Sequence, residues 1–255
     1  MHADTLSGRR AVITGASRGI GAAIAARLAA AGAQTVLIGR DANALAEQAK
    51  RIPNSQSVIC DVINAEQVEK IFAELLAHAP VDILINNAGA AESAPLSKTS
   101  DAMLERMLSV NLVSAFRCTR AVLPAMLARG FGRVVNVASI AGLRGYAYVT
   151  AYVAAKHALV GFTRALAMEV VQKGITVNAV CPGYTDTDLV RGAASAIAEK
   201  TRRSDDEVVQ EMIRTNPQGR LIRPEEVAET VAWLCGRETD SITGQAIPIA
   251  GGEIM

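Results

Sequence analysis

Three side chains in the stretch "SIAGLRGYAYVTAYVAAK" (139–156) have the chemistry to move a proton. Tyr152 and Lys156 are four residues apart, and residues with that spacing share one face of a helix. Ser139 follows the apolar run "GRVVNVA", which predicts a buried strand ending at this hydroxyl. A nearby ammonium is expected to lower the pKa of a phenol from its reference value of about 10, so Tyr152 can act as an acid or a base. Ser139 can donate a hydrogen bond to a substrate oxygen as negative charge develops on it.

The elements that must position these residues alternate between strands and helices. Strict alternation, with strands that are apolar on both faces, predicts an α/β fold: one domain over 1–255 with a seven-stranded, doubly wound parallel sheet and helices on both faces. Such a sheet binds ligands at the carboxyl ends of its strands. Asp41 is the expected N-cap of the second helix, and Pro124 can kink the helical region over 100–130. The predicted strands are 10–15, 33–39, 56–62, 81–89, 132–139, 175–183 and 244–252, and the predicted helices are 19–32, 41–51, 64–79, 100–130, 152–173, 188–215 and 223–236.

The first turn from strand to helix, "TGASRGIG" (14–21), suits a phosphate group. Gly15 permits a tight turn, Gly19 lets the backbone approach a phosphate, and Gly21 lets the helix lie close to the strand. The free N–H groups at the start of the helix would then face a pyrophosphate. The glycine spacing is GxxxGxG, and its place in the first βα turn predicts a dinucleotide cofactor.

Two arginines favour NADP over NAD. Arg18 lies in the glycine turn, and Arg40 follows the second strand, where an NAD site commonly has an acid for the ribose 2′-hydroxyl. Guanidinium groups suit a 2′-phosphate, whereas Asp41 leaves NAD open because its carboxylate could turn toward the ribose. Asp61 and Val62 end the third strand near an expected adenine, and "NNAG" (86–89) ends the fourth with small residues beside the cofactor.

Composition excludes several other classes of protein. The 255 residues carry a net charge of +1 and only 4% aromatic residues, which disfavours a nucleic-acid or membrane surface. No apolar stretch approaches the ~20 residues of a membrane span, and the first residues, "MHADTLSGRR", lack an apolar core for export. The four cysteines are far apart and are expected to be small core residues, and the three histidines are scattered, so no metal site is expected. A cytoplasmic protein is the natural expectation.

These motifs together resemble the short-chain dehydrogenase/reductase family. The matching pieces are "TGASRGIG", "DV" at 61–62, "NNAG" at 86–89, Asn111, Ser139, "YVAAK" and "PG" at 182–183, in family order over about 11–252. The resemblance implies a Rossmann-type domain, a nicotinamide cofactor, a dimer interface on the helices around 100–130 and 152–173, and a homotetramer. It assigns catalysis to Asn111, Ser139, Tyr152 and Lys156, with Asn111 holding a water that links Lys156 to solvent. It assigns cofactor binding to Gly15, Ser17, Arg18, Gly19, Ile20, Arg40, Asp61, Val62, Asn87, Ala88, Gly89, Tyr152, Lys156, Pro182, Gly183, Thr185 and Thr187.

The substrate is less constrained by these residues. The segment 184–222 resembles the family's substrate loop and lid, and the whole chain is most similar to 3-oxoacyl-thioester reductases and polyketide ketoreductases. "AAKHALVGFTRALAMEV" is also similar to 3-hydroxybutyrate and other hydroxyacyl dehydrogenases, so another secondary alcohol stays open. Four cations of the lid could meet the phosphates of a CoA or carrier-protein arm, or form a solvated helix face balanced by nearby acids: Arg191, Lys200, Arg202 and Arg203.

Two alternatives belong to other classes: a nicotinamide-binding regulatory subunit without turnover, and a structural subunit without cofactor. The intact Ser139, Tyr152 and Lys156 argue against the first, and the unbroken glycine turn argues against the second. His157 lies next to Lys156 but about 100° around the helix, which predicts a packing or interface role.

Overall fold

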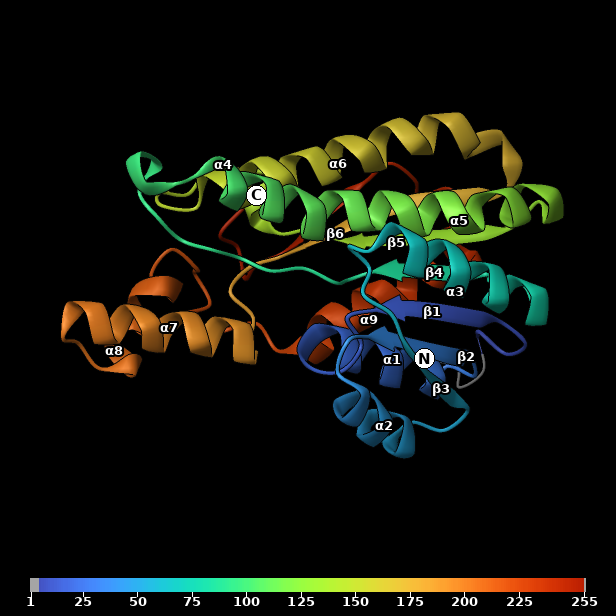
Figure 1. Ribbon diagram of the computed structural model, residues 1–255, viewed down its shortest axis with the longest axis horizontal. Helices are drawn as coiled ribbons and strands as arrows, with labels where there is room; N and C mark the ends of the chain where they lie inside the picture. Colours follow the sequence, from blue (N-terminus) through green and yellow to red (C-terminus); the bar gives the residue numbers. More distant parts are fainter. Residues whose placement is uncertain (1–4, 255) are drawn as a thin grey trace.

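A computed structural model describes residues 5–254 of the chain. These residues form a seven-stranded, entirely parallel sheet in the order β3-β2-β1-β4-β5-β6-β7, with helices on both faces (Figure 1). The doubly wound α/β prediction is therefore confirmed. The strands are β1 (Arg10–Thr14), β2 (Gln34–Gly39), β3 (Ser55–Ile59), β4 (Ile83–Asn86), β5 (Gly132–Val137), β6 (Ile175–Pro182) and β7 (Ala246–Ile249).

The helices divide between the two faces of the sheet. α1 (Gly19–Ala30), α2 (Ala42–Arg51) and α9 (Pro224–Cys235) cover one face, whereas α3 (Ala65–His78), α4 (Asp101–Leu108), α5 (Ser114–Arg129) and α6 (Thr150–Val170) lie on the other (Figure 1). α7 (Asp188–Thr201) and α8 (Asp205–Ile213) project from the body as a hairpin with a small apolar cluster of their own. The hairpin falls inside the segment predicted to be a lid.

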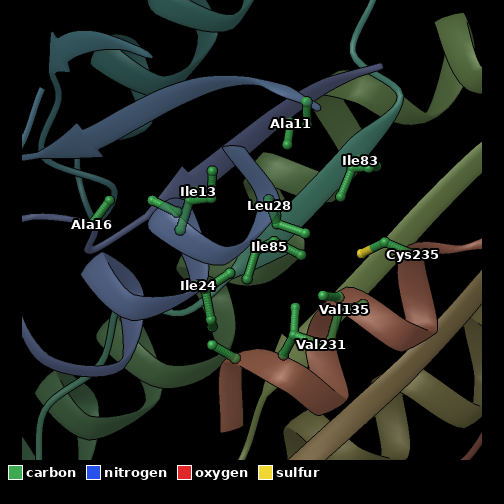
Figure 2. Close-up of a cluster of buried hydrophobic side chains, with 14 of the residues drawn as sticks. Ala11, Ile13, Ala16, Ile24, Leu28, Ile83, Ile85, Val135, Val231 and Cys235 are labelled. Atoms are coloured by element: carbon green, nitrogen blue, oxygen red, sulfur yellow. The ribbon is translucent and has the colours of Figure 1, made fainter. Parts of the chain in front are cut away.

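Alternation along the strands builds two separate cores. Ala11 and Ile13 of β1 pack with α1 and α9, and Figure 2 shows Ile24 and Leu28 of α1 in this cluster. Val12, between them, belongs to the cluster under α3, α5 and α6. Side chains that alternate in a strand point to opposite faces, so a central strand of this sheet is covered at every position and is mostly apolar. All five residues of β1 are indeed buried.

One local prediction was wrong. β3 is an edge strand with no fully buried residue, so it is not apolar on both faces, and it ends at Ile59, two residues before Asp61. The predicted helical region over 100–130 is confirmed by α4 and α5, which a π-helical turn at 109–113 joins, and Pro124 lies inside α5 without ending it. The π turn surrounds Asn111, and such turns are frequent at functional sites.

Other expectations are confirmed by packing. Asp41 caps α2 by accepting a hydrogen bond from the Ala44 N–H. Cys60, Cys118, Cys181 and Cys235 are all free and buried. Between residues 5 and 254, no helix combines the length and apolarity that crossing a bilayer requires.

Candidate active site

Ser139, Tyr152 and Lys156 converge at the carboxyl edge of the sheet. Ser139 lies two residues beyond β5, and α6 carries Tyr152 and Lys156 back over the same strand end. The Lys156 Nζ donates a hydrogen bond to the Val137 carbonyl at 2.9 Å and lies 5.7 Å from the centre of the Tyr152 ring. The Ser139 side chain is close enough to the Tyr152 hydroxyl to lower its pKa. The spacing read from the sequence therefore places the three side chains in one group.

Burial dominates the electrostatics of this group. Lys156 is only 4% exposed, and desolvation lowers its pKa to about 8. Burial likewise raises the pKa of Tyr152, and the nearby Ser139 side chain lowers it to a smaller extent. Among the chain's own groups, burial therefore outweighs the lowering that was expected for the pKa of Tyr152.

Asn111 ties the π turn to the loop after β4. Its Nδ2 donates to the carbonyls of Ala90 at 2.9 Å and Met107 at 3.0 Å, and its Oδ1 accepts from the Ala90 N–H at 3.3 Å. A Cβ on Gly89 would lie 2.8 Å from this Oδ1 and 3.6 Å from the Lys156 Nζ. Asn111 and Lys156 therefore meet at Gly89, where any larger residue would displace the amide.

The glycine turn is packed too tightly for side chains. Gly15 has φ +65°, and a Cβ there would approach the Ala88 Cα and the Asn87 Nδ2 to 2.9 Å. A Cβ on Gly21 would lie 2.3 Å from the Gly15 carbonyl oxygen. Asn87 locks the arrangement by donating from Nδ2 to the carbonyls of Thr14 and Gly15. α1 then begins with no side chain capping its N–H groups, which suits a pyrophosphate.

The residues expected around the adenosine fall into two groups. Arg18 and Arg40 are exposed, and over residues 5–254 neither guanidinium makes a hydrogen bond or an ion pair. Asp41, by contrast, uses its carboxylate to cap α2, and Asp61 accepts a weak bond from the Ile63 N–H at 3.3 Å. These residues fit a cofactor that brings a phosphate to the end of β2.

Most other expected cofactor residues lie along the same edge. Ser17 and Ile20 flank the start of α1, and Ala88 follows β4. Pro182 ends β6, and Gly183 follows it. The Val62 side chain, by contrast, packs into the core near α3.

The start of α7 reaches back to the glycine turn. The Thr187 methyl would lie 3.1 Å from a Cβ on Gly19, and the Thr187 hydroxyl caps α7 at Val190. Thr185 is 3% exposed, and its hydroxyl donates to the Gly183 carbonyl, so it faces inward. Arg191 makes two bonds to Asp186, at 2.7 and 2.9 Å, which favours the solvated-face alternative for this lid cation.

Several positioning residues escaped the sequence reasoning. Asn86 on β4 donates to Asn136 on β5 at 2.8 Å, and Asn136 donates to Thr163 on α6 at 2.8 Å, all three buried. This series of hydrogen bonds fixes α6, and with it Tyr152, against β5. Asn136 inside the apolar run "GRVVNVA" was the available signal, because a buried polar side chain needs a partner.

A second missed residue, Glu253, joins three segments of the chain. Its carboxylate accepts hydrogen bonds from Tyr146, in the loop after Ser139, and from Thr215, just after α8, both at 2.8 Å. The loop between Ser139 and Tyr152 is thus linked to the end of the α7–α8 hairpin, a contact that no local sequence pattern indicates.

Comparisons with known proteins agree with this arrangement. The family model of the short chain dehydrogenases matches residues 9–198. The 3-oxoacyl-[acyl-carrier-protein] reductase of Salmonella typhimurium is 35% identical over 98% of this chain and 99% of its own length.

Among solved structures, a variant of the actinorhodin polyketide ketoreductase with NADPH superposes with a TM-score of 0.93 at 36% identity, covering 99% of both chains. Levodione reductase superposes with a TM-score of 0.92 at 31% identity, covering 97% of this chain and 98% of its own. The chain therefore belongs to the short-chain dehydrogenase family and is an oxidoreductase of the kind that interconverts ketones and secondary alcohols with a nicotinamide cofactor.

Proposed function

We propose that this protein is an NADPH-dependent reductase of a 3-oxoacyl thioester, in one domain whose segment at about 184–222 forms the substrate lid. The convergence of Ser139, Tyr152 and Lys156 at one strand end carries the proposal, because it supplies a proton donor, a hydrogen-bond donor and a buried cation together. Similarity to a 3-oxoacyl-[acyl-carrier-protein] reductase and to a polyketide ketoreductase supports the substrate class.

The protein's own side chains transfer one proton to the substrate in this reaction. When bound, NADPH supplies the hydride that reduces the carbonyl carbon. Tyr152 gives its phenolic proton to the carbonyl oxygen, and Ser139 donates a hydrogen bond to the same oxygen as charge develops there. Lys156 stabilises the resulting phenolate and binds the cofactor ribose. Asn111 shapes the loop at Gly89 beside Lys156 and holds the water that returns a proton from solvent.

The cofactor preference rests on charge. Arg18 and Arg40 are unpaired and exposed beside the glycine turn and the end of β2, so they are available for a 2′-phosphate. The acid most able to favour NAD, Asp41, is already bonded to the Ala44 N–H. Charge-assisted hydrogen bonds contribute about 1.5–3 kcal/mol each, equivalent to about tenfold to hundredfold in affinity, and exposure reduces this. We propose that the other residues expected to bind the cofactor along this edge, including Thr185 and Thr187, also contact it.

A second substrate class has its own support. Levodione reductase, whose structure is similar over nearly the whole chain, is named for levodione and not for an acyl thioester. A secondary-alcohol dehydrogenase acting on a different ketone is therefore the alternative.

We also propose that this cytoplasmic enzyme is a homotetramer formed through α5 and α6. An apolar side chain is exposed on each of these helices, Phe116 at 44% and Met168 at 78%, which supports an interface there.

A cofactor comparison tests the proposal. We expect kcat/KM with a short 3-oxoacyl thioester to be at least about tenfold higher with NADPH than with NADH. Replacing both arginines, Arg18→Ala with Arg40→Ala, should erase that preference while leaving the NADH rate nearly unchanged. A wild-type preference for NADH would overturn the cofactor assignment, and turnover of a plain diketone but no thioester would select the alternative substrate.

A further inference from the structure

The amino-terminal edge of the sheet, opposite the candidate active site, holds a cavity of about 500 Å³ lined by arginines. Ligand pockets are typically about 300–1,000 Å³. Arg9 precedes β1, Arg129 ends α5, Arg133 is the second residue of β5, and Arg237 follows α9, so four separate elements bring a guanidinium here. This edge is where the strands begin, and it shares no lining residue with the glycine turn.

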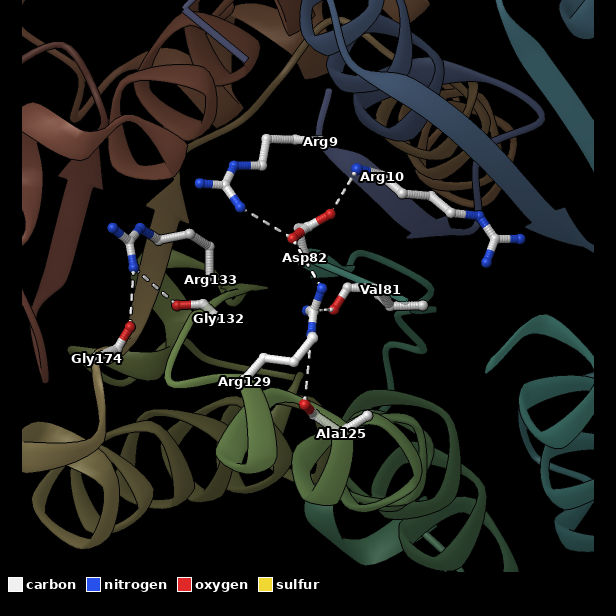
Figure 3. Close-up of polar contacts among 9 residues, drawn as sticks. All are labelled: Arg9, Arg10, Val81, Asp82, Ala125, Arg129, Gly132, Arg133 and Gly174. Atoms are coloured by element: carbon white, nitrogen blue, oxygen red, sulfur yellow. Dashed lines mark hydrogen bonds and ion pairs between the residues drawn. The ribbon is translucent and has the colours of Figure 1, made fainter. Parts of the chain in front are cut away.

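Charge at this cavity is not balanced by the protein. Figure 3 shows Arg9 and Arg129 reaching Asp82 from two sides, and both bond to the same oxygen, at 3.1 and 3.2 Å. Arg133 pairs with Asp240, whose side chain is 65% exposed. Arg237 makes no ion pair within the part of the chain that the structure describes. Four positive charges thus face two negative ones, an excess of two.

The guanidinium of Arg133 is buried and is not fully hydrogen-bonded. Its side chain is 2% exposed, and its Nε is buried without a hydrogen-bond partner among the described residues. Burial lowers its pKa, and the charges of Arg9 and Arg237 contribute in the same direction, while Asp240 opposes them. A buried N–H of a charged group is costly to leave unpaired, and an anion in the adjoining cavity would stabilise the charge of this guanidinium electrostatically.

The walls of the cavity also offer apolar surface. The guanidinium carbons of Arg9 and Arg133 lie 3.8 and 4.4 Å from the centre of the Phe131 ring, which holds both groups in place. Val171 and Ile175 line the same space. A ligand with a dianionic head and a small organic part would match both features.

We propose that this cavity binds a small phosphate monoester. A phosphate monoester carries about −1.5 to −2 charges at neutral pH and three strong acceptor oxygens, which complements an excess of two positive charges and forked guanidinium donors. The inference does not rest on the proposed function, because no residue of the catalytic group or the glycine turn takes part.

Isothermal titration calorimetry with glycerol 3-phosphate tests this inference. The protein is kept saturated with NADP⁺ so that the probe cannot occupy the glycine turn, and glycerol at the same concentration is the uncharged control. We expect saturable binding that weakens at least about fivefold in Arg237→Gln and in Arg129→Gln. The matched control, Arg51→Gln, removes an exposed arginine from the last turn of α2 and should bind like wild type.

Three results would overturn the inference: no saturable heat with glycerol 3-phosphate, equal weakening in Arg51→Gln, or wild-type affinity in both Arg237→Gln and Arg129→Gln. Because the Arg237 guanidinium makes no hydrogen bond or ion pair with residues 5–254, its replacement should leave the fold intact, and a far-ultraviolet circular dichroism spectrum checks this. Binding of inorganic phosphate with the same dependence on variants would support the same site.

Discussion

Replacing Lys156 by Met should remove the cost of burying an ammonium, so the stability difference between the variant and wild type should depend on pH. The pKa of Lys156 falls from 10.5 to about 8 in the folded chain. At about 1.4 kcal/mol per pKa unit, keeping this ammonium charged below pH 8 costs the fold up to about 3 kcal/mol. Methionine has a similar length and removes that cost, although it also leaves the Val137 carbonyl without its bond, a loss of about 1–3 kcal/mol that does not depend on pH.

The dependence on pH separates these contributions. Between about pH 8 and pH 10.5 the unfolded chain binds more protons at this lysine than the folded chain does, so wild-type stability should rise with pH relative to Lys156→Met. Buried cysteines such as Cys60, with its pKa raised to about 11, act in the opposite direction, but they are common to both proteins and cancel in the difference.

Urea unfolding measures this difference. Wild type and Lys156→Met are compared at several pH values at one protein concentration, with Lys70→Met, which replaces an exposed lysine of α3, as the matched control. We expect the stability gap between wild type and Lys156→Met to change by about 2–3 kcal/mol over the window, and the gap for Lys70→Met to stay flat. A constant gap for Lys156→Met would refute the claim that burial depresses this pKa.

Two further outcomes follow from the packing. Gly21→Ala should weaken NADPH binding by at least about tenfold, because its Cβ would meet the Gly15 carbonyl at 2.3 Å, whereas Gly192→Ala, which has open space, should bind normally in a fluorescence titration. Light scattering should show a homotetramer that Met168→Glu dissociates, since this residue of α6 is apolar and 78% exposed, and a monomeric wild type at micromolar concentration would contradict that expectation.

The sequence predicted the sheet and most of the site because both depend on local patterns. Continuous apolar runs located the central strands, and the i, i+4 spacing placed Tyr152 and Lys156 on one helix face. The features that the sequence did not reveal depend on tertiary context. The amide of Asn111, in the π turn, bonds to Ala90 and Met107, and the pKa of Tyr152 rises because the fold buries it. Neither effect has a local signature.

Long-range contacts were invisible for the same reason. Glu253 bonds to Tyr146 over a separation of 107 residues, and only the fold brings them together. The arginines at the amino-terminal edge likewise come from four elements, so their shared cavity emerges only when β1, β5 and the segments around them are assembled.

The most direct test of the central claim is the rate of NADPH oxidation with a short 3-oxoacyl thioester in wild type and Tyr152→Phe. The variant keeps the ring and loses only the proton-donating oxygen. We predict turnover in wild type, a loss of at least about a hundredfold in kcat in Tyr152→Phe, and NADPH binding in the variant within about twofold of wild type. A Tyr152→Phe enzyme that retained most of its kcat would contradict the assignment of Tyr152 as the proton donor.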